Sequence, residues 1–214
     1  MSEQIKAIET VYKGFRFRSR LEARWAVFFD TANIPYEYET EGFELPDGTR
    51  YLPDFYLPQY DWYVEVKPPR NGAWEDLKRA SRFVGEKIKV LLLLGNIPPK
   101  KDIELWHYYA MYFNTLRREV RIEKCCFDVA LAADQEPYTG LEISTWLGVD
   151  REQSWNISFL LHKPEKVLTA IHDREIGREF PWCETFADDE ERIKMLAKPY
   201  EKARQARFEY GEMG

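Results

Sequence analysis

The sequence contains little cysteine, little histidine and no long apolar run. The three cysteines are an adjacent pair, Cys125 and Cys126, and the distant Cys183, so they form neither a disulfide framework nor a paired CxxC zinc motif. The longest purely apolar run, residues 90–94, is far shorter than the roughly 20 residues that span a bilayer. The polar first residues (MSEQ) lack the apolar core of a secretory signal. We therefore expect a reduced, cytoplasmic protein without a membrane segment.

Several catalytic and binding motifs are also absent. Neither a G-x-G-x-x-G nor a Walker loop occurs, which argues against a nucleotide-driven motor. The sequence pattern identifies no histidine partner that would make the adjacent cysteines catalytic nucleophiles, so we interpret them as buried residues that pack in the apolar core. The three histidines, His107, His162 and His172, lack the spacing of metal ligands and are interpreted as surface or core residues.

Charge is abundant but unevenly distributed. The 214 residues are 44% hydrophobic, 15% aromatic and 32% charged, with a net charge of −6. Residues 1–100 are balanced, with 15 basic and 15 acidic side chains, whereas residues 101–214 have 16 against 22. Between positions 13 and 24, five cations are opposed by Glu22 alone. Such a local basic cluster is typical either of a solvated surface or of a phosphate-binding face, and it permits a nucleic-acid partner.

The first hundred residues predict a layered α/β core. Ser19 and Glu22 form an S-x-x-E capping box before an apolar helical repeat, which predicts a helix over 19–32 that ends at Asn33 and Pro35. Alternation, turn residues and apolar runs predict the elements that follow. These are strands at 36–39, 51–57 and 62–67, a turn at 46–49, a helix at 71–86 with Gly85 near its end, and a buried strand at 88–94. The order is α-β-β-β-α-β, and 1–100 is taken as one core domain.

The rest of the chain is harder to interpret. Residues 101–187 form an unassigned, mixed extension in which 121–129 and 155–162 have the pattern of strands. The aromatic residues of 106–113 are interpreted as a packed helix face, although they could stack on nucleic-acid bases. Residues 188–214 form a C-terminal tail, helical to about residue 209, which Pro199 should kink or divide.

The strands 51–57 and 62–67 predict a hairpin with an informative polar face. If the turn is centred on residues 59 and 60, Phe55 lies opposite Val64, and Asp54 lies opposite Glu65. One face is then wholly apolar and must be core. The other face brings together two carboxylates, with Lys67 one pleat beyond Glu65. Like charges so placed destabilise the pairing unless they are solvated or bridged by a cation.

A divalent cation would turn that repulsion into binding. Mg²⁺ prefers hard oxygen ligands and binds proteins through one or two carboxylates together with a substrate phosphate. An ammonium at position 67 could hold an attacking water or neutralise charge in a phosphoryl-transfer transition state. The helical Glu22 could supply a third carboxylate, or it could simply complete the capping box. A decorated surface strand stays the alternative interpretation of this face.

These residues carry a resemblance to a known family. The order Glu22, then Pro53-Asp54, then Glu65-Val66-Lys67, on an α-β-β-β-α-β framework, resembles the PD-(D/E)XK nuclease superfamily. The segments YKGFRFRSRLEARWAVFF, YLPDFYLP and VEVKP are similar to small phage and bacterial endonucleases of that superfamily, and the likeness covers about residues 11–95.

The resemblance implies a central mixed sheet flanked by helices, as in restriction endonucleases, and a Mg²⁺-dependent deoxyribonuclease that hydrolyses phosphodiesters with a water activated by Mg²⁺. Mn²⁺ would substitute for Mg²⁺. Asp54, Glu65 and the Val66 backbone carbonyl would bind the metal, Lys67 would orient or activate the water, and Glu22 would complete the site, with a metal-ligand role left open. The implied location is the cytoplasm of a bacterium or a phage-infected host. Separately, the local basic cluster suggests DNA phosphate contacts at Lys13, Arg16, Arg18 and Arg20.

Two other functions stay open at this stage. The same fold could serve as a nucleic-acid-binding module that does not cut. It could also be a nuclease-fold subunit, with the acidic C-terminal half binding a protein partner or a second copy of the chain. The choice between DNA and RNA, the number of metals and the biological process are not specified by these motifs.

Overall fold

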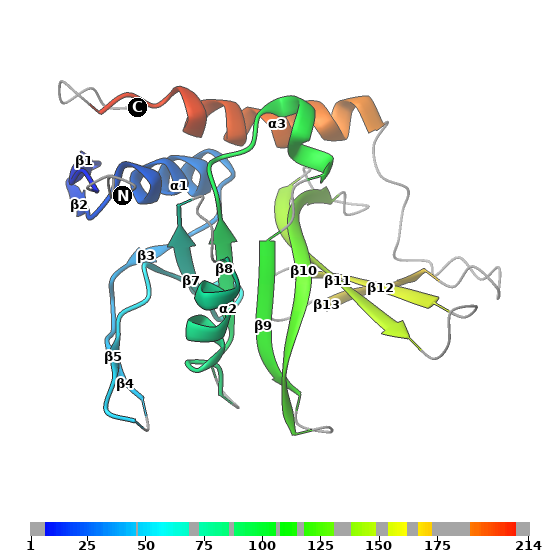
Figure 1. The fold of residues 1–214 in the computed structure, drawn as a ribbon. Coiled ribbons are helices and arrows are strands. Elements are labelled where there is room, and N and C mark those ends of the chain that lie inside the picture. The colour runs from blue at the N-terminus through cyan, green and yellow to red at the C-terminus, as the bar shows by residue number, and fades with distance from the viewer. Residues whose placement is uncertain are drawn as a thin grey trace, which may run out of the picture.

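In this computed structural model, the described residues are 7–45, 47–68, 73–85, 88–105, 108–114, 118–130, 138–148, 154–161, 167–172 and 189–208. They form a mixed α+β fold with three α-helices, shown in Figure 1. The helices are α1 (Arg20–Thr31), α2 (Ala73–Ser81) and α3 (Asp189–Gln205), and a 3₁₀ helix η1 covers Lys100–Leu105. The strands are β1 (Thr10–Tyr12), β2 (Phe15–Phe17), β3 (Glu37–Tyr38), β4 (Phe43–Glu44), β5 (Arg50–Tyr51), β6 (Phe55–Leu57), β7 (Trp62–Lys67), β8 (Val90–Leu94), β9 (Tyr108–Asn114), β10 (Glu119–Ala130), β11 (Tyr138–Gly148), β12 (Ser154–Leu161) and β13 (Val167–His172).

One large mixed sheet organises the chain. Its order is β13-β12-β11-β10-β9-β8-β7-β6-β3, and β7 and β8 are its one parallel pair among the described strands. Strands β1 and β2 form a separate two-stranded sheet, as do β4 and β5. The sheet continues without interruption from β8 into β9, so the segments on either side of residue 100 share one hydrogen-bonded layer.

Helix α1 begins as the capping box predicts. The Ser19 side chain accepts a hydrogen bond from the Glu22 backbone N–H at 3.2 Å, and Asn33 lies just beyond the helix with a φ of 55°. Its apolar side, which includes Trp25, Phe28 and Phe29, is fully buried. The predicted helix over 19–32 is therefore confirmed.

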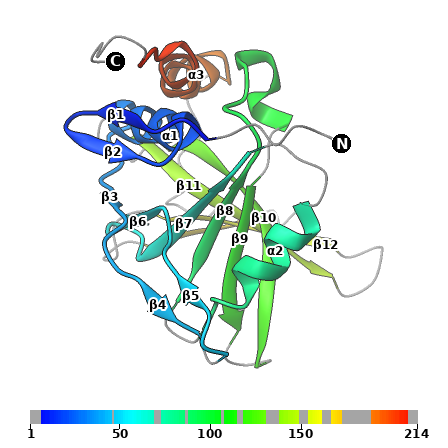
Figure 2. The same ribbon diagram turned by 60° about the vertical axis from the view of Figure 1, so that its left-hand side comes forward.

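The two faces of the sheet are covered by different helices (Figure 2). On one face α1 packs with α3, where the rings of Phe28 and Tyr200 lie 4.6 Å apart. Trp25 also contacts Tyr108 of β9 on this face, at 5.3 Å between ring centroids. On the other face α2 packs through Leu77 and Ala80 on the alternate side chains of β8 and β9. Residues far beyond position 100 thus complete the core around α1.

The predicted hairpin register is confirmed for the three residue pairs that form, but the predicted strand 51–57 is divided. Tyr51 belongs to β5, which pairs with β4 in a separate sheet, and β6 begins only at Phe55, after Pro53, which has no N–H to donate to a ladder. Strands β6 and β7 pair Phe55 with Val64, Tyr56 with Tyr63, and Leu57 with Trp62. The face expected to be apolar is buried throughout. Strands β8, β10 and β12 likewise coincide with the segments expected to form them, and helix α3 forms in the expected tail but ends at Gln205, earlier than the expected residue 209. Cys125 is buried in the core, as its interpretation required, whereas the side chains of Cys126 and Cys183 lie outside the described residues.

Three other expectations are wrong. Residues 108–114 form strand β9 rather than a helix face, because their side chains alternate between the two cores instead of recurring every three or four residues. Helix α2 ends at Ser81, since the next backbone N–H groups bond carbonyls three residues back and tighten the turn. Gly85 is therefore not its cap and instead exchanges two backbone hydrogen bonds with Ile88. Pro199 does not divide α3, which continues as one helix.

Some elements had no sequence prediction. The hairpin β1–β2 lies within the basic cluster, and strands β11 and β13 extend the sheet. His107 and His162 lie outside the described residues, and His172 ends β13. Within the described ranges, no helix is both long and apolar enough to cross a membrane.

Candidate functional site

The predicted polar face lies where β6 begins and β7 ends. The pairing of β6 with β7 stops at Phe55 and Val64, so Asp54 stands one residue beyond the ladder. Its carboxylate is turned toward β7, where Oδ2 accepts a hydrogen bond from the Val66 N–H at 2.7 Å. The two strands therefore hold Asp54 beside Glu65, as the register predicts.

Both carboxylates are buried. Asp54 is 3% exposed and Glu65 7% exposed, which excludes the alternative of a solvated surface strand for this face. Burial, and then the negative charge of Glu65, raises the pKa of the Asp54 carboxyl to about 8. Glu65 Oε2 is buried without a hydrogen-bond partner. Two buried acids that repel each other, one with an unsatisfied oxygen, leave the site short of positive charge.

Lys67 supplies part of that charge. Its ammonium forms an ion pair with Glu65 Oε1 and lies 3.4 Å from the Val66 carbonyl oxygen, to which it donates. The alternation of β7 brings the two side chains to the same face. This arrangement agrees with the expected neighbourhood of Glu65, Val66 and Lys67.

Glu22 lies on α1 and is held by three donors. Its Oε1 accepts from the Ser19 hydroxyl at 2.7 Å, and its Oε2 accepts from the Arg18 N–H at 3.1 Å and the Tyr38 hydroxyl at 2.8 Å. The capping box is thus altered, because the Glu22 carboxylate bonds the Arg18 amide and not the Ser19 amide. Glu22 is 7% exposed, and its negative charge also contributes to the raised pKa of Asp54.

Arg18 joins the two acidic positions. Its guanidinium lies 2.6 Å from Asp54 Oδ1 and 2.5 Å from Glu39 Oε1, while its backbone N–H bonds Glu22. The sequence predicts Arg18 as a phosphate contact, and the structure adds that its guanidinium contacts the acidic site. This contact depends on the tertiary structure, because the pairing of β3 with β6 brings Glu39 and Asp54 together beside the segment that carries Arg18.

The other three predicted phosphate contacts lie on the β1–β2 hairpin and at the start of α1. Lys13 pairs with Asp30 at 3.1 Å, and Arg16 pairs with Glu9 at 3.4 Å, with both cations exposed. Arg20 is half-buried at the start of α1. The exposed pairs contribute little to stability and leave their cations able to exchange partners.

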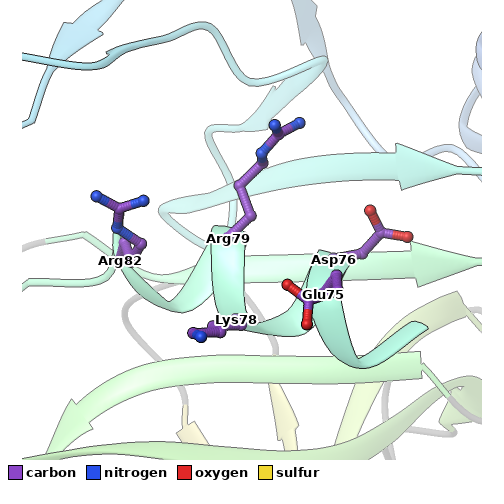
Figure 3. Close-up of a pocket in the computed structure, with 5 residues that line it drawn as sticks. All are labelled: Glu75, Asp76, Lys78, Arg79 and Arg82. Atoms are coloured by element: carbon purple, nitrogen blue, oxygen red, sulfur yellow. The ribbon is translucent and has the colours of Figure 1, made fainter. Parts of the chain in front are cut away.

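A depression of about 390 Å³ along α2 adds groups that the sequence reasoning missed. It is lined by two acids and three cations, which are Glu75, Asp76, Lys78, Arg79 and Arg82 (Figure 3). Figure 3 shows the Arg79 guanidinium extending away from the helix. The charges of Arg79 and Glu65 both act on the hydroxyl of Tyr51, whose pKa burial raises above its ordinary value. The available signal was the three cations in a row of five positions, Lys78 and Arg79 in α2 and Arg82 just after it.

The described residues fit a hard divalent cation at Asp54 and Glu65. The donors are carboxylate oxygens, one of them has no hydrogen-bond partner, and the buried acids need a compensating charge. No group of three or more His, Cys, Asp and Glu side chains in the described ranges is gathered as a metal site, so the fit rests on these two carboxylates. Mg²⁺ keeps several waters and needs no more than one or two such ligands.

Comparison with family models, with curated proteins and with solved structures found no match to this chain.

Tyr38 should act as a positioning residue for Glu22. Replacing Tyr38 with phenylalanine removes one of the donors that orient the Glu22 carboxylate, and we expect about a tenfold lower rate of the reaction proposed below. Tyr36→Phe is the matched control, since its hydroxyl contacts Asp30 at 3.5 Å, away from the site. The measurement is the cleavage rate beside the melting temperature. Equal rates in the two variants would contradict the positioning role.

Proposed function

We propose that this protein is a metal-dependent endonuclease of the PD-(D/E)XK type that hydrolyses phosphodiester bonds of DNA. The observation that carries the proposal is the buried pair of Asp54 and Glu65 beside Lys67, with an unsatisfied carboxylate oxygen. A solvated strand has no reason to bury two carboxylates at the end of a hairpin. A cation site beside a positioned ammonium would explain why both carboxylates are buried.

The order of elements supports the same proposal. Helix α1 carries Glu22, strands β6 and β7 carry the two carboxylates and Lys67, and α2 leads back to β8, which is parallel to β7. This is the expected α-β-β-β-α-β arrangement, with the small sheets β1–β2 and β4–β5 added. The mixed sheet lies between α1 on one face and α2 on the other.

Each residue has a proposed role in the hydrolysis. Asp54 and Glu65, with the Val66 carbonyl, would hold the cation, which when bound would polarise the phosphate and lower the pKa of water. Lys67 orients the attacking water and balances charge that develops on the phosphate oxygens. A P–O bond forms from the water, the P–O bond to the leaving oxygen breaks, and that oxygen is protonated. Glu22, positioned by Tyr38, completes the acidic site.

Arg18 has two alternative partners in this proposal. Its guanidinium compensates the charges of Asp54 and Glu39. With those carboxylates compensated by a cation, Arg18 would be free to contact a substrate phosphate, for which a guanidinium has the matching bidentate geometry. Both roles need a positive charge at this position.

The proposal is tested by a nuclease assay on supercoiled plasmid, single-stranded DNA and branched DNA, each with Mg²⁺, Mn²⁺ or EDTA. We expect cutting with either metal and none with EDTA. DNA retention without cutting in any metal would instead identify a binding module. If DNA is neither cut nor retained, the proposal for this chain alone would be wrong. The chain would then be a subunit whose activity or binding depends on a protein partner.

Metal affinity should depend steeply on pH. The cation would bind ionised Asp54, whose pKa burial and the charge of Glu65 raise to about 8 despite the ion pair with Arg18, so Mg²⁺ would compete with a proton below that pH. Affinity for Mg²⁺ should therefore rise about tenfold per pH unit from pH 6 to 8 and level off above that. Calorimetric titrations at pH 6, 7, 8 and 9 measure the dependence. An affinity that does not change over this range would contradict the buried-acid site.

A further inference from the structure

The hairpin β1–β2 leads into the proposed site through Arg18, which follows β2 and contacts Asp54, while its turn lies toward the other end of α1, where Lys13 pairs with Asp30 at 3.1 Å. Its turn is formed by Lys13 and Gly14, whose φ values of 48° and 83° are both positive, the pattern of a two-residue hairpin turn with matched strand twist. The hairpin is anchored from beneath, because Tyr12 and Phe17 are buried and the Phe17 ring packs 4.4 Å from that of Tyr38. It lies beside α1 in both Figure 1 and Figure 2. The hairpin is therefore a rigid, supported projection.

The hairpin exposes a large apolar side chain on each of its two faces. Phe15 is 51% exposed on the face that it shares with Tyr12 and Phe17, and Val11 is 59% exposed on the face that it shares with Arg16; Ile8, immediately before the hairpin, is also exposed. These are three of the six exposed large apolar side chains in the described residues, and they lie within eight positions of one another. Clustered exposure of this kind marks a binding surface more often than scattered exposure does.

Cations lie between these apolar residues. Positions 10–21 contain Lys13, Arg16, Arg18 and Arg20 and no acidic residue. Lys13 belongs to the turn that precedes Phe15, and Arg16 follows it. An exposed ring beside the turn lysine, with a further exposed cation on the other face of the same short hairpin, complements a base and the phosphates on either side of it, whereas an apolar protein partner would have no use for the cations. The charge pattern thus favours nucleic acid as the occupant.

The hairpin is close enough to the site to contact the same strand. Phe15 precedes Arg18 by three residues, which is at most about 10 Å of extended chain. Arg18 itself contacts Asp54. Ten ångströms corresponds to about three nucleotides along a stacked strand. The ring of Phe15 can reach the face of a base only if that base is unpaired and unstacked.

We propose that the β1–β2 hairpin binds unpaired nucleotides beside the phosphodiester that is cut, with Phe15 stacking on a base and Lys13 and Arg16 contacting phosphates. This inference rests on the proposed nuclease function and specifies its substrate class. The preferred substrate is a single strand, or a branched DNA with a single-stranded stretch, and not an uninterrupted duplex.

The test measures binding separately from cutting. Lys67→Ala serves as the background, and the fluorescence anisotropy of a labelled single-stranded oligonucleotide and of a duplex of equal length is followed in Mg²⁺ at fixed salt. Adding Phe15→Ala should weaken single-strand binding by about 5- to 100-fold and change duplex binding less than twofold. Phe15→Trp should retain single-strand binding. Ile122→Ala is the matched control, since Ile122 is an exposed apolar strand residue on β10.

Each outcome decides the inference. A selective loss with Phe15→Ala and retention with Phe15→Trp supports it. Equal losses of affinity for the single strand and the duplex would overturn the inference, and so would no loss of affinity for either. Unchanged affinity for both would indicate that the exposed apolar residues bind a protein partner. Because binding is measured in a non-cutting background, failure of the wild type to cut any substrate would defeat the proposed function without deciding this result. Melting temperatures verify that every variant is folded.

Discussion

Lys67→Ala should cut DNA about 10²- to 10⁴-fold more slowly than the wild type. The substitution removes the ammonium that pairs with Glu65 while leaving both carboxylates and the Val66 carbonyl in place. Binding of Mg²⁺ should persist or tighten, because a competing positive charge has gone. The expected result is therefore a greatly reduced cutting rate together with an undiminished affinity for Mg²⁺, as measured by calorimetry.

The matched control for Lys67 is Lys89→Ala. Lys89 is a partly exposed lysine just before β8, paired with Asp61 at 3.1 Å and located toward the opposite end of β7 from Lys67. It should cut at the wild-type rate. If Lys67→Ala cuts as fast as this control, Lys67 has no part in the chemistry. Circular dichroism and thermal melting of both variants separate a catalytic loss from a folding loss.

Asp54→Asn should abolish Mg²⁺ binding and cutting while making the metal-free protein more stable at high pH. The amide oxygen can still accept the hydrogen bond from Val66, but it carries no charge beside Glu65. The Asp54 pKa is raised from 3.8 to about 8 in the folded state, so the stability that this group contributes is lost as pH rises from about 4 to about 8. The asparagine variant has no group to ionise at this position and so loses no stability from it as pH rises. Its melting temperature should therefore exceed that of the wild type most clearly above pH 8.

Melting curves between pH 5 and 9, with and without Mg²⁺, test this expectation. Mg²⁺ should raise the melting temperature of the wild type and leave that of Asp54→Asn unchanged. Asp61→Asn is the matched control, because Asp61 lies in the turn of the same hairpin, is exposed, and has a φ of 56° that asparagine tolerates. Metal binding that survives in Asp54→Asn would show that the cation site lies elsewhere.

The site's backbone could be predicted from the sequence, but its network of contacts could not. The alternation of Phe55, Leu57, Trp62 and Val64 is enough to fix the pairing of β6 with β7, since one face must be buried. That pairing places Asp54 near Glu65 and puts Lys67 on the same face. The partners Tyr38 and Arg18 leave no such periodic pattern, because their hydrogen bonds to Glu22 and Asp54 depend on how β3 and the loop before α1 meet.

The wrong prediction for residues 106–113 has a similar cause. A run in which nearly every residue is aromatic or apolar fits a helix or a buried strand equally well. In the structure α1 and α3 cover one face of the sheet and α2 covers the other. Tyr108 and Tyr109 therefore both contact apolar cores although they point to opposite faces, which is the pattern of a buried strand. The end of α2 at Ser81 was equally hidden, since Phe83 leaves the helix to pack against Tyr51, 4.4 Å away.

By itself the sequence determined the local features of this protein. The cap of α1, the β6–β7 register, the burial of β8 and the juxtaposition of two carboxylates with a lysine all follow from residues close to one another along the chain. The tertiary structure alone decided that α3 covers α1, that β9 and β10 continue the sheet, and that Arg18 turns into the acidic site. Those features depend on contacts between segments distant in sequence, such as the 36 residues between Arg18 and Asp54, where side-chain packing and charge compensation select the partner.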